Sequence, residues 1–252
     1  MTETPAPVAI QTEKPQSPKL AWGPAAAIIV SLLAYFISQA VLVLSVVPIA
    51  LFNRGEQLDT LLSNSPWINL VLTGISSLSL LAVLWVFLRA RKQTFKSLGF
   101  RKIKLSDLGW LGLAVIVYFI LLAITMTIAS HIPHFNAEQA QDVGYKSAVG
   151  WQLILAFVGL VVLPPLAEEM LFRGFLYRGL ASKWPKIIAA LVTSLLFAIV
   201  HFQWNVGVDV FVLSMVLIAL YEKTKNLWMC VFLHAIKNGL AFLAIFVFVN
   251  SM

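Results

Sequence analysis

The chain alternates between long apolar runs and short polar segments, and this pattern predicts its elements. Seven runs are almost wholly apolar, at residues 22–52, 66–88, 107–130, 147–163, 187–203, 205–221 and 227–249. A helix that rises about 1.5 Å per residue needs roughly 20 apolar residues to cross a hydrocarbon layer of about 30 Å. We therefore predict an all-α fold, a polytopic membrane helix bundle of about seven transmembrane helices.

The composition supports this interpretation and narrows the class of protein. Of the 252 residues, 60% are hydrophobic and only 12% are charged, and the mean hydropathy is +0.89. Such values are typical of an integral, multi-pass membrane protein that lies in the lipid bilayer, which in a bacterium is the plasma membrane. The single cysteine, Cys230, excludes an intramolecular disulfide.

The Lys and Arg residues of the loops predict the orientation. The segment 89–106, between the second and third runs, holds seven basic residues. Together with the other segments on its side of the membrane the count is 14, against two, Arg54 and Lys146, on the opposite side. Short loops rich in Lys and Arg face the cytoplasm, so we predict a cytoplasmic N-terminus. The net charge of +7 follows from this bias, and no nucleic-acid partner is expected.

Three parts can be distinguished along the chain. Residues 1–20 are polar and proline-rich and lack a short apolar core, which predicts a disordered cytoplasmic tail and not a cleaved signal peptide. Residues 21–146 are predicted to form scaffold helices around the basic inner loop 89–106. Their apolar runs contain no ionisable residue other than Asp107. Residues 147–249 differ, because ionisable residues lie inside their apolar runs.

These intramembrane ionisable residues are the candidates for a functional site. The stretch LPPLAEEMLFRGFLYRGL, residues 163–180, places two glutamates and two arginines where a membrane helix is expected to continue. A charge at the centre of a membrane helix costs about 3 kcal/mol on insertion scales, so such residues mark functional sites. The candidates are Glu168, Glu169, Arg173, His201, Asp209, His234 and Lys237.

Helical spacing and depth predict that several of these side chains meet. Glu169 and Arg173 are four residues apart on one helix face with the acid first, so they can neutralise each other. Counted from basic residues at the inner ends of the helices, Glu168, His201 and His234 lie at depths of roughly 22, 22 and 14 Å. We expect these three to converge in a polar, water-filled cavity, with Lys237 offsetting part of the excess acid.

The residue types in this cluster are suited to amide hydrolysis. Glu168 and His201 that share a water molecule would act as a general base, which removes a proton as the oxygen attacks an electrophile. His234 and Asn238, four residues apart, offer donors to an oxyanion on a carbonyl. Glu168, His201 and His234 could instead bind a divalent metal such as Zn²⁺, although the chain has no HExxH motif. The residues leave metal dependence open.

Three segments in this order resemble a known family. EEMLFR, FAIVH and HAIKN match the motifs EExxxR, FxxxH and HxxxN of the CPBP family, which comprises type II CAAX prenyl proteases and bacteriocin-processing, Abi-like proteins. The resemblance extends over about residues 147–248 and implies an intramembrane endopeptidase, in a family often labelled metalloprotease. It makes residues 147–249 the catalytic core. The implied roles are water activation by Glu168 and His201, oxyanion stabilisation by His234 and Asn238, and support of the site by Glu169 and Arg173.

Two other functions are alternatives to the endopeptidase. Buried Glu, His and Arg groups also form proton relays in coupled transporters, although this chain shows no internal repeat of the kind that many transporters have. A non-catalytic membrane scaffold or immunity protein would keep the fold, although every motif position is present here. For the preferred endopeptidase, the expected substrate is a membrane protein or peptide, either a lipidated protein trimmed at its C-terminus or a peptide precursor.

Overall fold

The structure is a computed structural model that describes residues 20–52, 61, 65–137, 139, 144–145 and 148–248. Within these ranges every regular element is a helix. Six helices are long and apolar enough to cross a membrane, and a seventh, α8, is a shorter apolar helix. The predicted all-α polytopic bundle is therefore confirmed. The predicted tail, apart from Leu20, and both Arg54 and Lys146 lie outside the described residues.

The helices follow the order of the predicted apolar runs. Their bounds are α1 Pro24–Phe52, α3 Pro66–Ala90, α4 Leu105–Ala129, α5 Gln152–Phe157, α6 Leu163–Glu169, α7 Arg178–Ala181, α8 Lys186–Ile199, α9 Trp204–Thr224 and α10 Leu227–Leu243. Four short elements complete the set, the 3-10 turn η1 Phe95–Leu98 and the π-helical segments η2 Val158–Val162, η3 Met170–Tyr177 and η4 Ala244–Phe248. The helix of the fourth run continues through the charged stretch as expected, and the structure departs from the prediction mainly at the fifth run.

The fourth helix is much longer than its apolar run. The elements from α5 to α7 form one helix of 30 residues, Gln152–Ala181, so the charged stretch does not end it. Pro164 and Pro165 lie at the start of α6, directly after η2. In η2 the N–H of Leu163 bonds the carbonyl of Val158, five residues back, and this wider turn accommodates residues that cannot donate.

The fifth helix is shorter than predicted, which changes the setting of His201. We expected a run over 187–203 with His201 inside a helix, but α8 ends at Ile199. The backbone then turns, with a left-handed conformation at Phe202 (φ 52°), before α9 begins. His201 therefore lies in a tight turn between two helices, where its backbone groups are not fixed by a continuing helix.

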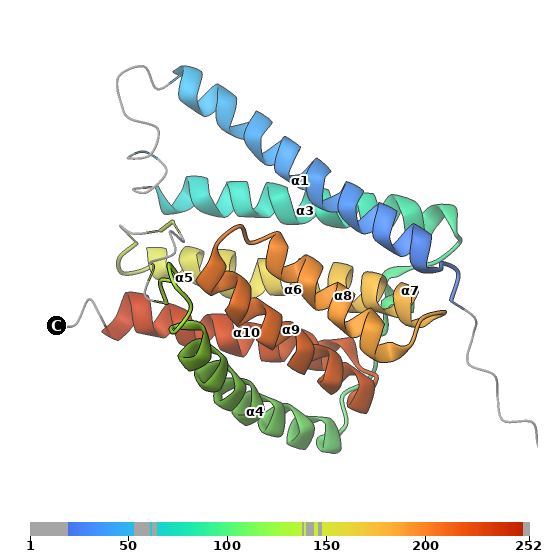
Figure 1. The fold of residues 1–252 in the computed structure, drawn as a ribbon. Coiled ribbons are helices and arrows are strands. Elements are labelled where there is room, and N and C mark those ends of the chain that lie inside the picture. The colour runs from blue at the N-terminus through green and yellow to red at the C-terminus, as the bar shows by residue number, and fades with distance from the viewer. Residues whose placement is uncertain are drawn as a thin grey trace, which may run out of the picture.

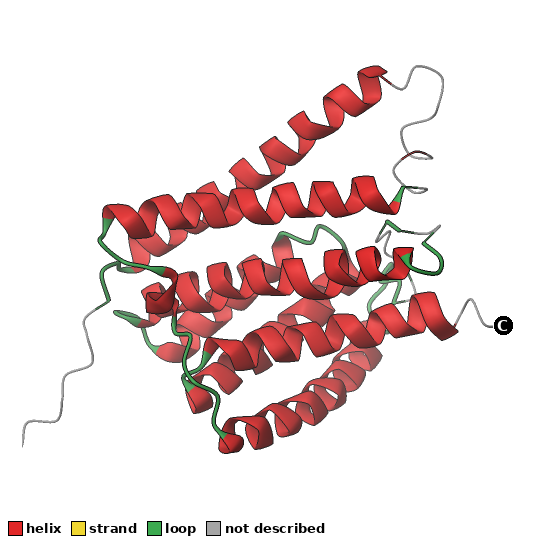
Figure 2. Ribbon diagram, turned by 180° about the vertical axis from the view of Figure 1, so that it is seen from behind, coloured by secondary structure: helices red, strands yellow, loops and turns green. Residues whose placement is uncertain are grey.

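The helices pack around the segment that carries the charged stretch. α1 and α3 cross and pack against each other along one side of the molecule, and the Gln152–Ala181 helix lies next to them (Figure 1). Seen from behind, α10 runs beside that helix and α4 lies furthest from α1 (Figure 2). All eight residues of η3 are buried, because α1, α8, α9 and α10 all pack on it. The charged stretch is thus at the centre of the bundle.

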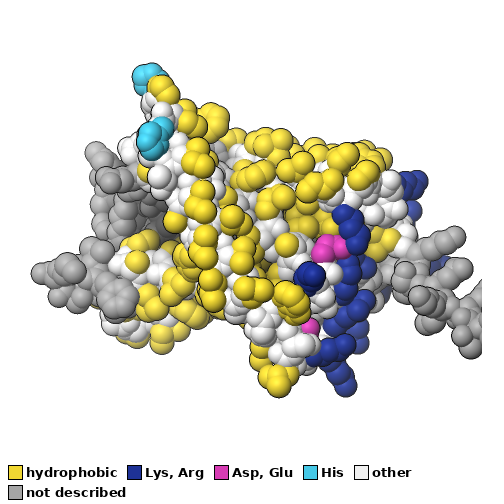
Figure 3. All heavy atoms as spheres, turned by 60° about the horizontal axis from the view of Figure 1, so that its bottom comes forward, with side chains coloured by type: hydrophobic (Ala, Val, Ile, Leu, Met, Phe, Trp, Pro, Cys, Tyr) yellow, Lys and Arg dark blue, Asp and Glu magenta, His cyan; other side chains and the backbone are white. Residues whose placement is uncertain are grey.

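Basic side chains gather at one end of the bundle. Figure 3 shows the Lys and Arg side chains together at that end, while apolar side chains cover most of the remaining visible face. Large apolar side chains such as Leu44, Ile120 and Ile154 are more than half exposed, as expected for helices that face lipid. Basic side chains at one end and apolar side chains elsewhere are the distribution expected if the basic loop 89–106 faces the cytoplasm. The orientation of the N-terminus stays a prediction.

Candidate active site

The buried glutamate and arginine of the fourth helix form the ion pair that their spacing predicts. Arg173 Nη1 lies 2.7 Å from Glu169 Oε1, and both side chains are fully buried. The guanidinium group also lies over the ring of Phe197, 4.4 Å from the ring centroid. Pairing and the aromatic face offset much of the cost of burying these charges. A membrane helix can therefore carry both residues at the centre of the bundle.

His234, on α10, connects this ion pair to Glu168. Its Nδ1 atom is 2.9 Å from Glu169 Oε1, and its Nε2 atom is 3.9 Å from Glu168 Oε2. The Glu169 carboxylate, paired with Arg173, can only accept a hydrogen bond, so Nδ1 of His234 carries a proton. The structure thus brings Glu168 and His234 together and directs Nε2 toward the exposed glutamate.

The ring of His201 is oriented by a backbone carbonyl in the last turn of α8. Its Nδ1 atom is 2.7 Å from the carbonyl oxygen of Phe197, which can only accept, so Nδ1 donates. A neutral His201 consequently presents an unprotonated Nε2, the form that accepts a proton. The Phe197 ring meets both histidine rings edge to face, with centroids 5.0 Å from His201 and 5.9 Å from His234.

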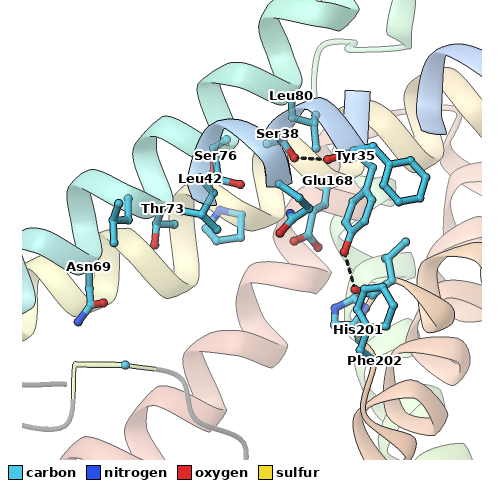
Figure 4. Close-up of a pocket in the computed structure, with 18 of the residues that line it drawn as sticks. Tyr35, Ser38, Leu42, Asn69, Thr73, Ser76, Leu80, Glu168, His201 and Phe202 are labelled. Atoms are coloured by element: carbon cyan, nitrogen blue, oxygen red, sulfur yellow. Dashed lines mark hydrogen bonds between the residues drawn. The ribbon is translucent and has the colours of Figure 1, made fainter. Parts of the chain in front are cut away.

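A cavity of about 860 Å³ opens beside these residues. Glu168 and His201 both line it, and Figure 4 shows their side chains at the same open space, with the ring of Tyr35 reaching toward His201. The side chain of Glu168 is 27% exposed, whereas that of Glu169 is fully buried. Of the two adjacent glutamates, Glu168 is therefore the one that water or a substrate can reach.

Asn238 satisfies a carbonyl that the two prolines leave without a helical partner. Its Nδ2 atom donates to the carbonyl of Leu160 at 2.9 Å. The residues four and five positions after Leu160 are Pro164 and Pro165, and neither has a backbone N–H. The amide of Asn238 thereby ties α10 to η2, and its second N–H is left for another acceptor.

The remaining charged candidates pair with each other away from the cavity. Lys237 Nζ lies 3.0 Å from Asp209 Oδ2, and the hydroxyl of Tyr118 donates to Asp209 Oδ1 at 2.5 Å. This cluster joins α4, α9 and α10. Lys237, which was expected to offset part of the excess acid, thus pairs with Asp209.

The arrangement of side chains bears on the metal alternative. Within the described ranges, no group of three or more His, Cys, Asp or Glu side chains lies close enough to hold a metal ion. Nδ1 of His201 and Nδ1 of His234 are engaged by a carbonyl and a carboxylate, which leaves Nε2 of each ring as the possible ligand atom. Of Glu168, His201 and His234, the described contacts join Glu168 and His234, whose Oε2 and Nε2 atoms are 3.9 Å apart. This donor set does not fit a three-ligand zinc site.

Sequence reasoning missed the residues that the first two membrane helices contribute. One side of the cavity is formed by α1 and α3, which the absence of ionisable residues had marked as scaffold. Their contribution consists of neutral polar side chains among apolar ones, and the polar members are Tyr35, Ser38, Gln39, Asn69, Thr73, Ser76 and Ser77. The signal was present in the sequence, since 35, 38 and 39 share one helix face, as do 69, 73, 76 and 77.

Comparisons with known proteins agree with the three motifs. A family model described as "Type II CAAX prenyl endopeptidase Rce1-like" matches residues 149–240. The UPF0177 protein YxdF of Lactococcus lactis subsp. lactis (strain IL1403) is 24% identical over 163 residues, which are 63% of this chain and 88% of that protein. YdiL of Bacillus subtilis (strain 168), provisionally named a membrane peptidase, is 29% identical over 77 residues, 31% of this chain and 32% of that protein.

No solved structure matches the chain. The matching region, residues 149–240, contains the charged stretch of the fourth helix, the His201 turn and the HAIKN segment. Together with the apolar helices, these similarities indicate an integral membrane protein of an intramembrane protease type. The match of residues 149–240 to the Rce1-like model confirms the resemblance of this chain to the CPBP family of CAAX-type endopeptidases.

Proposed function

We propose that this protein is an intramembrane endopeptidase that hydrolyses a peptide bond with a water molecule activated by Glu168 and His201. The observation that supports this most strongly is that both side chains line one cavity inside a bundle of apolar helices. A carboxylate and an imidazole at a shared space are suited to general-base catalysis. The neutral tautomer of His201, set by the Phe197 carbonyl, leaves Nε2 free to hold the water.

The proposed reaction needs only water and the side chains described. Glu168 accepts a proton from the water as its oxygen bonds to the carbonyl carbon of the scissile peptide, which gives a tetrahedral oxyanion. The carbon–nitrogen bond then breaks, and Glu168 returns the proton to the leaving nitrogen. His201 orients the water through Nε2. General-base assistance of this kind contributes about 10²- to 10⁴-fold.

His234 and Asn238 are proposed to stabilise the oxyanion. The Glu169 carboxylate holds the Nδ1 proton of His234, so a second proton on Nε2 gives an imidazolium that donates toward the space next to Glu168. With His234 protonated, the charges of Glu168, Glu169, Arg173 and His234 sum to zero. Asn238 would donate its second N–H, while the first stays on Leu160. Preorganised donors of this kind stabilise charge that develops in the transition state.

The cavity lining supports an uncharged, extended stretch of a membrane protein or peptide as the substrate. Among the described residues that line it, the ionisable side chains apart from tyrosine are Glu168 and His201. A peptide bond can be cut only when the segment is unwound, and an unwound backbone inside a membrane needs hydrogen-bond partners. The hydroxyls and amides of α1 and α3 can supply them. The substrate would be a lipidated protein or a peptide precursor.

The experiment compares the termini of membrane proteins in cells that lack the protein or carry it as wild type, Glu168→Gln or Glu222→Gln. Glu222 pairs with Lys186 and Lys225 away from the cavity, so its substitution is a matched control. We expect a set of new termini with the wild type and the control that is absent with Glu168→Gln. Equal termini in all four samples would contradict the proposal. A phenotype of the deletion that Glu168→Gln still rescues would indicate a scaffold.

A further inference from the structure

The backbone N–H groups of the turn that carries His201 cap the C-terminal end of α8. A helix leaves its last four carbonyls without intrahelical donors. Here the carbonyls of residues 196–199 accept from the backbone N–H groups of residues 200–202 and from the ring of His201. The end of α8 is therefore closed locally, up to and including residue 199.

The next carbonyl, that of Val200, is satisfied from a different helix. The hydroxyl of Tyr35, on α1, donates to it at 2.9 Å (Figure 4). Val200 directly precedes His201, so the peptide unit that α1 holds is the one that leads into the His201 backbone. On the other side of His201 the backbone is left-handed at Phe202, with φ 52°. The contact from Tyr35 thus acts on a turn that is not fixed by a continuing helix.

We propose that Tyr35 is a positioning residue for His201, so that the first membrane helix completes the active site. Tyr35 has one hydroxyl hydrogen to donate, and it is used in the hydrogen bond to the Val200 carbonyl. The phenol therefore acts through the turn and not as a donor to the substrate. Tyr35 lies outside the region that matches the family model, residues 149–240. The kinetic part of this inference rests on the proposed peptidase function, whereas the structural part does not.

The hydrogen bonds that hold His201 have different origins. Its ring bonds the carbonyl of Phe197 and its backbone N–H bonds the carbonyl of Ala198, both in the last turn of α8, whereas the carbonyl of the preceding residue, Val200, bonds Tyr35 on α1. Without the hydroxyl, the Val200 carbonyl faces the half-buried space without its donor, and the turn relaxes or admits water to satisfy it. A displacement of about 1 Å at a catalytic group can cost about 100-fold in rate.

The test removes only the hydroxyl, in Tyr35→Phe, with Tyr118→Phe as the matched control. Tyr118 is also a tyrosine of a membrane helix whose hydroxyl makes one hydrogen bond, but it is buried and bonds to Asp209 outside the cavity. We expect Tyr35→Phe to lower kcat by about 10- to 100-fold with KM unchanged within twofold, and Tyr118→Phe to leave both unchanged. In a His201→Gln background, Tyr35→Phe should change kcat by less than twofold, because its effect passes through His201.

A second measurement does not depend on activity. The chain has four histidines, so a ¹⁵N-histidine-labelled sample in detergent gives four ring spin systems, which single His→Gln variants assign. We expect Tyr35→Phe to shift the ring signals of His201 and leave those of His131 and His134 unchanged. Tyr118→Phe should leave His201 unchanged. Thermal scans of both variants check that the fold is kept.

Several results would overturn the inference. One is an unchanged His201 signal together with a kcat within twofold of wild type. Another is a rise in KM with an unchanged His201 signal, which would make Tyr35 a substrate contact. A wild-type protein without peptidase activity would count against the proposed function, and the His201 signals would still decide the role of Tyr35.

Discussion

Loss of the buried cation Arg173 should destabilise the protein more than the substitution Glu168→Gln at the proposed catalytic glutamate. In Arg173→Ala, His234 is the remaining partner of Glu169 Oε1. The side chains of Glu169 and Arg173 are both fully buried in the wild type. Removing one member of a buried ion pair costs about 3–5 kcal/mol, because the remaining charge is left unpaired. For a chain of this size each kcal/mol lowers Tm by about 2–4 °C. The expected drop is therefore about 6–20 °C.

The assay is a thermal scan of intrinsic tryptophan fluorescence in detergent, at one scan rate for all variants, because unfolding of such proteins is often irreversible. The chain has eight tryptophans to report it. The control is the double variant Glu169→Gln with Arg173→Met, which removes both charges and keeps most of the volume. It should recover at least half of the lost Tm, since no unpaired charge remains.

The reasoning about the ion pair would be refuted in either of two ways. A drop in Tm of less than about 3 °C for Arg173→Ala would mean that Glu169 does not depend on this cation. A double variant that is less stable than Arg173→Ala alone would mean that the Arg173 side chain stabilises by packing, for example on Phe197, and not by its charge.

Three further predictions concern the proposed catalytic glutamate Glu168, the asparagine of α10 and the orientation. Glu168→Gln should keep Tm within about 2 °C, because the side chain is partly exposed and nearly the same shape, and should lose about 10²- to 10⁴-fold in peptide cleavage. Full cleavage activity would refute its role as the base. Asn238→Asp should lower Tm more than Asn238→Ala does, because a carboxylate places a second acceptor against the Leu160 carbonyl oxygen. If Asn238→Ala lowered Tm more, the hydrogen bond from Asn238 to Leu160 would not be stabilising. A cysteine at Lys96 should be labelled only from the cytoplasmic side and one at Ser130 only from the opposite side, in cells and vesicles; the opposite pattern would invert the orientation.

The parts of the site that the sequence could predict are those set by spacing along one helix. Glu169 and Arg173 pair as their separation of four residues predicts, because a helix fixes that geometry locally. The apolar runs likewise predicted the helices and their order. The continuation of the fourth helix through its charged stretch was also predicted, from the need to bring its charged side chains to those of other helices, and the structure shows one helix over Gln152–Ala181.

Contacts between distant parts of the chain could not be predicted in the same way. His201 was expected inside a helix, and its place in a turn depends on where α8 ends, which hydropathy does not determine. The link from Tyr35 to Val200 spans 165 positions and joins two neutral groups, so neither charge nor spacing indicates it. The role of Asn238 at Leu160 could have been suspected, since two adjacent prolines leave a carbonyl that some other donor has to reach.

The cavity is lined by two separate parts of the chain. The proposed acid–base residues, Glu168 and His201, lie within residues 149–240, whereas one side of the cavity is formed by α1 and α3. Under the proposed function, exchange of these two helices between related proteins is expected to change which substrates are cut while Glu168 and His201 stay in place, provided that Tyr35 moves with them. Substrate preference could then vary without any change at the proposed acid–base residues.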